Sequence, residues 1–171
     1  MNSIYLGSCH ELIEQRIIDG VCDFFINRFN IKNGGLHFIS TQGNEPVDVM
    51  CLNYIDKNHY SRELYRPLEQ SKPSIMQKCE YAIVFNSHRK TDFGHANGVD
   101  FTLGSLATNI KRKVIEVHLN LNSISVYDCK NGRRLEYLRP EEFFYEFDEN
   151  GSIIIETMLE KMKRMGKLYG K

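Results

Sequence analysis

Apolar residues change their spacing along the chain in a way that predicts alternating strands and helices. Residues 3–7 (SIYLG) form a short apolar run that closes in a Gly-Ser turn. Helical spacing follows in the apolar positions Leu12, Ile13, Ile17, Val21, Phe24 and Phe25. Residues 81–85 (YAIVF) are apolar without interruption, which is typical of a strand buried on both faces of a parallel sheet. Because 98–110 then predict a helix and 114–119 another strand, this half of the chain is an α/β unit.

Further elements are expected on either side of this unit. Short runs of β-formers predict strands at 36–40 and 47–51. Between 60 and 79 we expect two short helices, because Pro67 and Pro73 each remove a backbone donor and clash with the preceding turn.

The C-terminal third predicts a hairpin and a closing helix. The hairpin would join 124–128 to 133–138 through an Asn-Gly turn, which tolerates the positive φ that such a turn requires. Over 152–166 one apolar stripe recurs at helical spacing, formed by Ile154, Ile155, Met158, Leu159, Met162 and Met165. The stripe either packs on the chain's own sheet or forms an interface between copies of the chain.

Length and composition are those of one globular domain spanning 1–171. Hydrophobic residues make up 42% and charged residues 26%, which excludes a disordered or fibrous chain. The 22 basic and 22 acidic residues cancel to a net charge of zero, so no general positive field favours a nucleic-acid partner. No nucleic acid is therefore expected among the partners.

The cysteines and the absence of a long apolar run indicate a cytoplasmic protein. Five cysteines are widely spaced and include no C-x-x-C pair, so neither a disulfide framework nor a zinc ribbon is indicated. No run approaches the roughly 18 apolar residues of a spanning helix, and the N-terminus does not have the pattern of a signal peptide. We expect no membrane association and no cofactor.

The loop at 86–100 is the richest chemical stretch of the sequence. It follows the most apolar strand and contains His88, Arg89, Lys90, Asp92, His95, Asn97 and Asp100. Gly94 and Gly98 permit close approach of the backbone to a ligand. Loops at the carboxyl end of such strands commonly bind ligands, so a polar ligand is expected here. A solvated surface loop is the alternative, and a metal site formed by its histidines and aspartates fits no familiar ligand spacing.

The first strand and its turn form a second candidate region. Tyr5, Gly7 and Ser8 precede a predicted helix, where backbone amides favour an anionic or strongly hydrogen-bonding ligand. The G-x-G-x-x-G spacing is absent, and any strand-to-helix turn uses Gly and Ser. Cys9, beside His10 at the helix start, is a candidate nucleophile or an ordinary packing residue.

Three segments taken together resemble the nucleoside 2-deoxyribosyltransferase family, which includes nucleotide N-hydrolases. They are IYLGS near the start, YAIVF with its Asp- and Gly-bearing loop, and GVDFTLGSLATNIKRKVIEV. The last segment matches the family's helix pattern at Gly98, Val99, Phe101, Leu103, Gly104, Lys113, Val114 and Ile115. The resemblance covers roughly residues 3–8 and 60–119.

This resemblance implies a fold and an assembly. The fold would be a doubly wound, mainly parallel sheet of the three-layer Rossmann or flavodoxin-like type, with the C-terminal β-hairpin and helix added to it. Members of the family commonly build their sites across subunit interfaces, so the resemblance implies a homo-oligomer that binds a nucleoside or nucleotide.

The resemblance also implies cleavage of an N-glycosidic bond, with the sugar transferred to another base or to water. A carboxylate would stabilise or attack the sugar carbon as the base leaves. The family's catalytic Glu aligns with Thr102, which has no carboxylate. Asp100 is the nearest acid and is either the relocated catalytic group or a helix N-cap. Asp92 matches the family's loop Asp, which helps to bind the sugar or base.

Substrate contacts are implied for several other positions. Tyr5 and Gly7 match first-strand positions that line the base pocket, while Ser8 and Ser87 favour a phosphate. Two hypotheses follow from these residues. The chain is a deoxyribosyltransferase or N-glycosidase with a rearranged carboxylate, or it is a nucleotide-binding protein that senses or sequesters its ligand without turnover.

Overall fold

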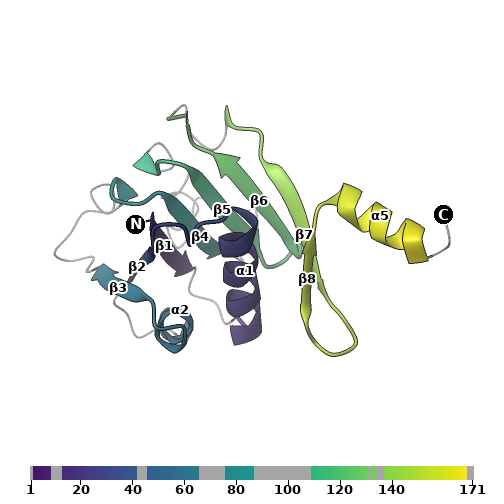
Figure 1. Cartoon of the computed structure of the whole chain (residues 1–171), viewed down its shortest axis with the longest axis horizontal. Helices are drawn as coiled ribbons and strands as arrows, with labels where there is room; N and C mark the ends of the chain where they lie inside the picture. The colour runs from purple at the N-terminus through teal and green to yellow at the C-terminus, as the bar shows by residue number, and fades with distance from the viewer. Residues whose placement is uncertain are drawn as a thin grey trace.

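Strands dominate the computed structural model, which describes residues 2–8, 13–41, 46–65, 76–86, 109–130, 132–133 and 137–168. Within these residues eight strands form one sheet in the order β3-β2-β1-β4-β5-β6-β7-β8 (Figure 1). They are β1 (Asn2–Ser8), β2 (Leu36–Thr41), β3 (Ser61–Tyr65), β4 (Tyr81–Asn86), β5 (Lys113–His118), β6 (Ser123–Asp128), β7 (Glu141–Phe147) and β8 (Ile153–Glu156).

The sheet is mixed, and the predicted doubly wound, mainly parallel three-layer fold is wrong. The four pairings among β1 to β5 are parallel, and the three pairings from β5 to β8 are antiparallel. Short turns explain two of the three antiparallel pairings, because a strand that reverses after a few residues cannot pair in parallel with its predecessor. The residues at 119–122 join β5 to β6, and those at 148–152 join β7 to β8. The C-terminal strands therefore extend the sheet itself and are not an appended hairpin.

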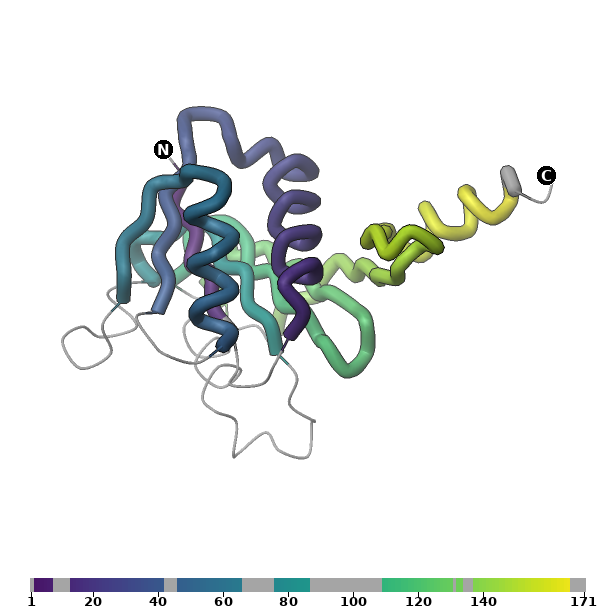
Figure 2. The backbone as a smooth tube through the Cα atoms, turned by 90° about the horizontal axis from the view of Figure 1, so that it is seen from below, coloured from purple at the N-terminus to yellow at the C-terminus, as the bar shows by residue number. Residues whose placement is uncertain are grey.

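Two helices cover one face of the sheet. They are α1 (Gln15–Arg28) and α2 (Pro46–Lys57), which lie side by side in Figure 2. The steps from β1 to β2 and from β2 to β3 run in the same direction, so right-handed crossovers place both helices on the same face. A Cβ at Gly20 would lie 2.2 Å from the Ile153 side chain, so the glycine allows α1 to approach β8. Among the described residues a further helix, α5 (Met158–Leu168), projects beyond the sheet (Figure 1).

Apolar side chains fill both sides of the sheet. The larger cluster lies between the sheet and the two helices α1 and α2. It contains two separate groups of packed aromatic rings. Phe143 of β7 packs edge to face on Phe25 of α1, and Phe38 of β2 stacks on Tyr60. A second cluster on the opposite face includes Tyr5, Ile39, Tyr65, Ala82, Val84 and Val114.

Several predicted elements differ from the observed ones. Residues 47–51 belong to α2, because Pro46 suits the first helical position and the buried residues Val47, Cys51, Tyr54 and Ile55 recur at helical spacing. Residues 61–65 form β3 where helix was expected. The partner of β6 is β7, and not the segment at 133–138. Residues 153–156 form β8, so the closing helix begins later than predicted.

Candidate functional site

The carboxyl ends of the five parallel strands meet at one edge of the sheet. From β1 the chain builds outward through β2 and β3 on one side, whereas β4 and β5 lie on the other side. The order in which successive strands are added to the sheet therefore changes direction between β1 and β4. In open α/β sheets ligands bind outside the carboxyl ends of the strands at such a reversal. Gly7 and Ser8 end β1 there, and Asn86 ends β4.

Tyr5 and Gly7 form one side of this edge, on the face opposite α1 and α2. A Cβ at Gly7 would lie 2.7 Å from the Tyr5 ring, so the glycine leaves room for the ring to lie along the strand. The Tyr5 hydroxyl reaches Thr41 Oγ1 of β2 at 3.1 Å. Burial is the main cause that raises the pKa of Tyr5 to about 12. Tyr5 is therefore a neutral, fixed phenol at physiological pH.

A polar cluster occupies the same face on β5 and β6. Glu116 and His118 share the face of Val114, since side chains alternate along the strand. His118 Nε2 lies 3.2 Å from Glu116 Oε1 and 3.0 Å from Ser125 Oγ. Ser125 is the direct partner of Glu116 across the antiparallel β5–β6 pair. The Glu116 side chain is only 10% exposed, so this carboxylate is held in a largely dry environment.

The geometry of this cluster determines what chemistry it can perform. A serine–histidine–carboxylate relay needs both ring nitrogens, one for the serine and one for the acid. Here both partners contact Nε2, so the three residues do not form such a relay. The direction of the hydrogen bond between Nε2 and Ser125 depends on the histidine tautomer, and the contact with Glu116 is an ion pair when the ring is protonated. In that protonated form the pair combines a buried carboxylate with a proton donor.

Strand register aligns the two parts of the edge. Gly7 pairs with Val84, and Val84 pairs with Glu116. Two steps between neighbouring strands correspond to about 10 Å. Gly7, Val84 and Glu116 therefore lie in one row across β1, β4 and β5.

The described cysteines are not candidates for a reactive thiol. Burial raises the pKa of Cys79 to about 12 and of Cys129 to about 11. It also raises the pKa of Cys22 and Cys51 well above that of a free thiol. All four are buried and unbridged, so they behave as packing residues.

The structure brings together only part of the predicted site. Tyr5, Gly7 and Ser8 lie at the expected edge on β1. The remaining predicted site residues lie outside the described residues, namely Ser87, Asp92, Gly94, Gly98, Asp100 and Thr102. The same holds for Cys9, His88 and His95. Among the residues that the structure does describe, no group of three His, Cys, Asp or Glu side chains is arranged to hold a metal ion.

Sequence reasoning missed Thr41, Glu116, His118 and Ser125. A signal for Glu116 was present, because a glutamate stands between apolar neighbours in a strand predicted to be buried. Ser125 had no comparable signal, since only its pairing across the sheet brings it to Glu116.

Comparisons with known proteins add no family to this description. No family model matches the chain, and no curated protein matches it significantly. Within the part of the chain that is described, no helix has the length and apolar character needed to cross a membrane.

Proposed function

We propose that the chain acts on the N-glycosidic bond of a nucleoside or nucleotide bound at the carboxyl edge of β1, β4 and β5. The observation that carries this proposal is the buried Glu116 carboxylate beside His118, in register with Gly7. The sequence has Thr102 where the family it resembles has a catalytic Glu. Glu116 offers a second source of the missing carboxylate, besides Asp100.

The proposed reaction assigns one role to each polar group. As the bond from the sugar C1′ to the base nitrogen breaks, its electron pair leaves with the base. The Glu116 carboxylate faces the positive charge that develops at C1′, or forms a bond to it. Protonated His118 donates its Nε2 proton to the departing base. Water or a second base then attacks C1′, and where Glu116 has bonded to C1′ that bond breaks with its electron pair returning to the carboxylate. The attacking group gives a proton to His118.

The remaining contacts would position the substrate. The Tyr5 ring occupies the space beside Gly7, so in this proposal the ligand lies beyond that ring at the carboxyl end of β1 and not on the Gly7 backbone. The Tyr5 side chain is 6% exposed and its hydroxyl is hydrogen-bonded to Thr41. We therefore give it a role in holding the end of β1 in place and no stacking contact with the ligand. Asp92 and Ser87 retain the sugar and phosphate contacts that the sequence resemblance implies.

Binding without turnover is the second candidate function. Thr102 favours it, because a hydroxyl at the catalytic position of the family supplies neither a nucleophilic carboxylate nor a negative charge. In that case Glu116 and His118 would hydrogen-bond the sugar hydroxyls of a retained ligand.

The proposal is tested by measuring the release of free base. The substrates are a panel of nucleosides and 5′-nucleotides, each with and without an acceptor base. Glu116→Gln should slow release by about 100-fold or more, because the amide cannot carry the negative charge. Glu63→Gln is the matched control. Glu63 lies 3.7 Å from His37, on strands of the same sheet, but is 39% exposed and away from the β4–β5 edge. This control should release base at the wild-type rate.

Each alternative outcome has a distinct meaning. Ligand binding without any release by the folded wild-type protein would establish the second function. Release that persists in Glu116→Gln but is lost in Asp100→Asn would assign the carboxylate to Asp100. Neither binding nor release for any panel member would reject both functions.

A further inference from the structure

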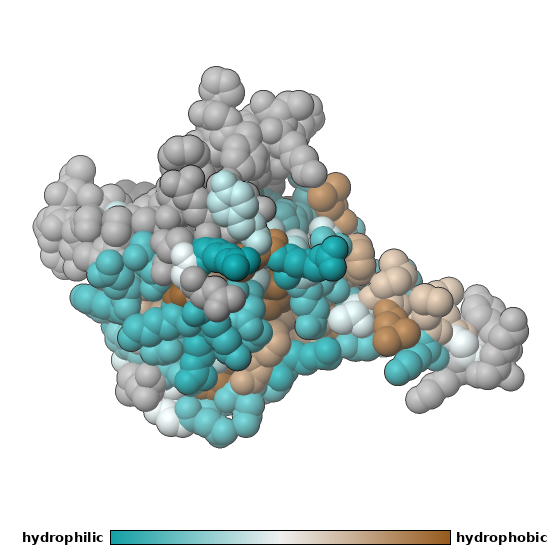
Figure 3. Space-filling model, turned by 90° about the horizontal axis from the view of Figure 1, so that it is seen from above, coloured by the Kyte–Doolittle hydropathy of each residue, from teal (hydrophilic) through white to brown (hydrophobic). Residues whose placement is uncertain are grey.

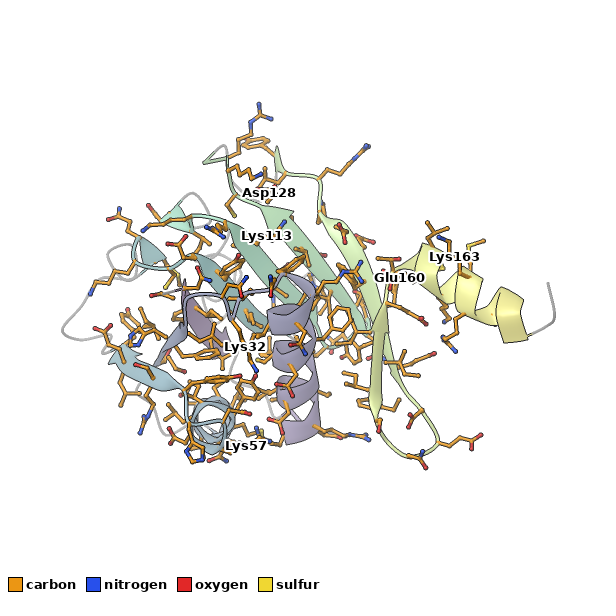
Figure 4. The ribbon with its side chains drawn as sticks, in the orientation of Figure 1. Lys32, Lys57, Lys113, Asp128, Glu160 and Lys163 are labelled. Atoms are coloured by element: carbon orange, nitrogen blue, oxygen red, sulfur yellow. The ribbon has the colours of Figure 1, made fainter. Side chains whose placement is uncertain are left out.

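The C-terminal helix α5 is attached to the rest of the molecule by its charged side. Arg164 donates from Nε and Nη2 to the Glu156 carboxylate at 2.7–3.2 Å, and from Nη2 to Glu146 at 2.8 Å. Arg28 of α1 donates to Glu160 at 2.8 Å. Figure 4 labels Glu160 at the end of α5 that adjoins the sheet. These contacts orient the polar side of α5 toward its own chain.

The apolar side of α5 faces solvent. Exposed fractions are 52% for Met158, 61% for Leu159, 63% for Met162 and 39% for Met165. Tan and brown atoms follow the projecting arm in Figure 3. An amphipathic helix that packs on its own sheet has the reverse orientation, with apolar residues inward and charges outward. The sequence left two roles open for the apolar stripe of this helix, namely packing on the chain's own sheet or contact with another copy. The exposed methionines show that this part of the stripe does not pack on the sheet.

We propose that the apolar face of α5, formed by Met158, Leu159, Met162 and Met165, is the interface of a two-fold symmetric homodimer. In a two-fold contact the same patch serves both partners, so the patch must complement itself. The three methionines recur after four and three residues, which is the seam spacing of paired helices. Antiparallel pairing centred between positions 161 and 162 places Met158 of each copy opposite Met165 of the other.

Charge favours a second copy over an anionic surface. A helix that binds anionic lipid or nucleic acid presents uncompensated lysines and arginines to it. On α5 two of the described basic side chains form ion pairs with carboxylates of the same chain, namely Lys161 with Glu146, and Arg164 with Glu146 and Glu156. Glu160 of α5 pairs with Arg28 of α1. The charges of these side chains are therefore compensated within the chain, and the apolar residues are the part of α5 that a second copy can contact.

The position of α5 also permits this contact. The helix follows β8, the last strand of the sheet, and projects away from α1 and α2 (Figures 1 and 2). Methionine side chains adapt their shape to a facing surface, which suits a seam made of three of them.

Sedimentation and light scattering of the full chain test the proposal. Wild type should have twice the 20.0 kDa mass of one chain, and Met162→Glu should have the mass of one chain. Val49→Glu is the control, since Val49 is 47% exposed on α2 and lies away from α5. It should remain dimeric. Equal thermal unfolding of the two variants would show that the glutamate at 162 affects association and not folding.

A cross-link gives a second, independent measurement. Met162→Cys should form a disulfide-linked dimer on mild oxidation, whereas Val49→Cys should not. A monomeric wild type at every concentration, or a Met162→Glu protein that stays dimeric, would overturn the proposal. A monomer that binds vesicles of phosphatidylcholine with phosphatidylglycerol would instead assign the face to a lipid surface.

Discussion

The two halves of the sheet each bury one glutamate, and the partners of the two carboxylates differ. Glu116 of the parallel half and Glu156 of the antiparallel half both have side chains that are 10% exposed. Glu156 is held by the Arg164 guanidinium, which stays protonated at any pH the fold survives. Glu116 is held by His118, whose type titrates near neutral pH.

This difference separates a carboxylate that attaches an element of the fold from the one for which we propose a role in chemistry. An arginine fixes its partner as an anion and exchanges no proton with it, so Glu156 serves to attach α5. A histidine accepts and returns a proton, so the pair of Glu116 and His118 is suited to acid–base chemistry. Buried charge alone therefore does not mark a site, whereas the nature of its partner does.

The largest expected effect tests whether the two halves share one core. Phe143 is fully buried in the antiparallel half and packs on Phe25, while Phe38 is fully buried in the parallel half. Phe143→Ala and Phe38→Ala should each cost about 3–5 kcal/mol, through lost burial and a cavity. Urea unfolding followed by two spectroscopic probes measures this.

Both variants should unfold in a single cooperative transition. If Phe143→Ala instead separates the unfolding into two steps while Phe38→Ala does not, the antiparallel half is an independent unit. The comparison between the halves would then be one between two domains.

A smaller effect is expected from removing the charge of Glu156. Glu156→Gln should lower the free energy of unfolding by less than either phenylalanine substitution, because Arg164 is 43% exposed and water screens the pair. Base release should not change. Glu142→Gln, at an exposed position on β7, is the stability control. Loss of base release in Glu156→Gln would remove the distinction drawn between the two glutamates.

Local sequence patterns predicted a strand most clearly where every residue in a run is apolar. The run in β4 identified a buried strand, and all of its residues are buried. The β3 sequence SRELY has no such run, and it becomes a strand because it pairs with β2. In α2, Val47 and Val49 have strand propensity, but burial of one helical face against α1 and the sheet outweighs it.

Part of the candidate site was equally predictable. Tyr5 and Gly7 were found because a strand that ends in a small-residue turn is a local pattern. The contact of His118 with Ser125 depends on the β5–β6 register. No spacing along the chain specifies that register, and the hairpin expected in this region paired β6 with the wrong segment.

The smallest expected effect concerns the ion pair between α1 and α5. The hydrogen bond from Arg28 is the main cause that lowers the pKa of the Glu160 carboxyl below its ordinary value of 4.5. A carboxyl with a depressed folded-state pKa stabilises the fold above its unfolded pKa, and this contribution is lost as the pH falls through the folded value. Glu160→Gln should therefore unfold at a slightly lower temperature than wild type at neutral pH.

This difference should vanish in acid below the folded pKa of Glu160, and it should shrink in high salt, because the two side chains are 37% and 39% exposed. Glu149→Gln, in the exposed turn after β7, serves as the control and should show no pH-dependent difference. A deficit of Glu160→Gln that persists unchanged in acid would mean that packing, and not charge, joins α5 to α1. The polar side of α5 would then owe its orientation toward α1 to packing, and the Arg164 contacts with Glu156 and Glu146 would be the charge interactions that hold the helix.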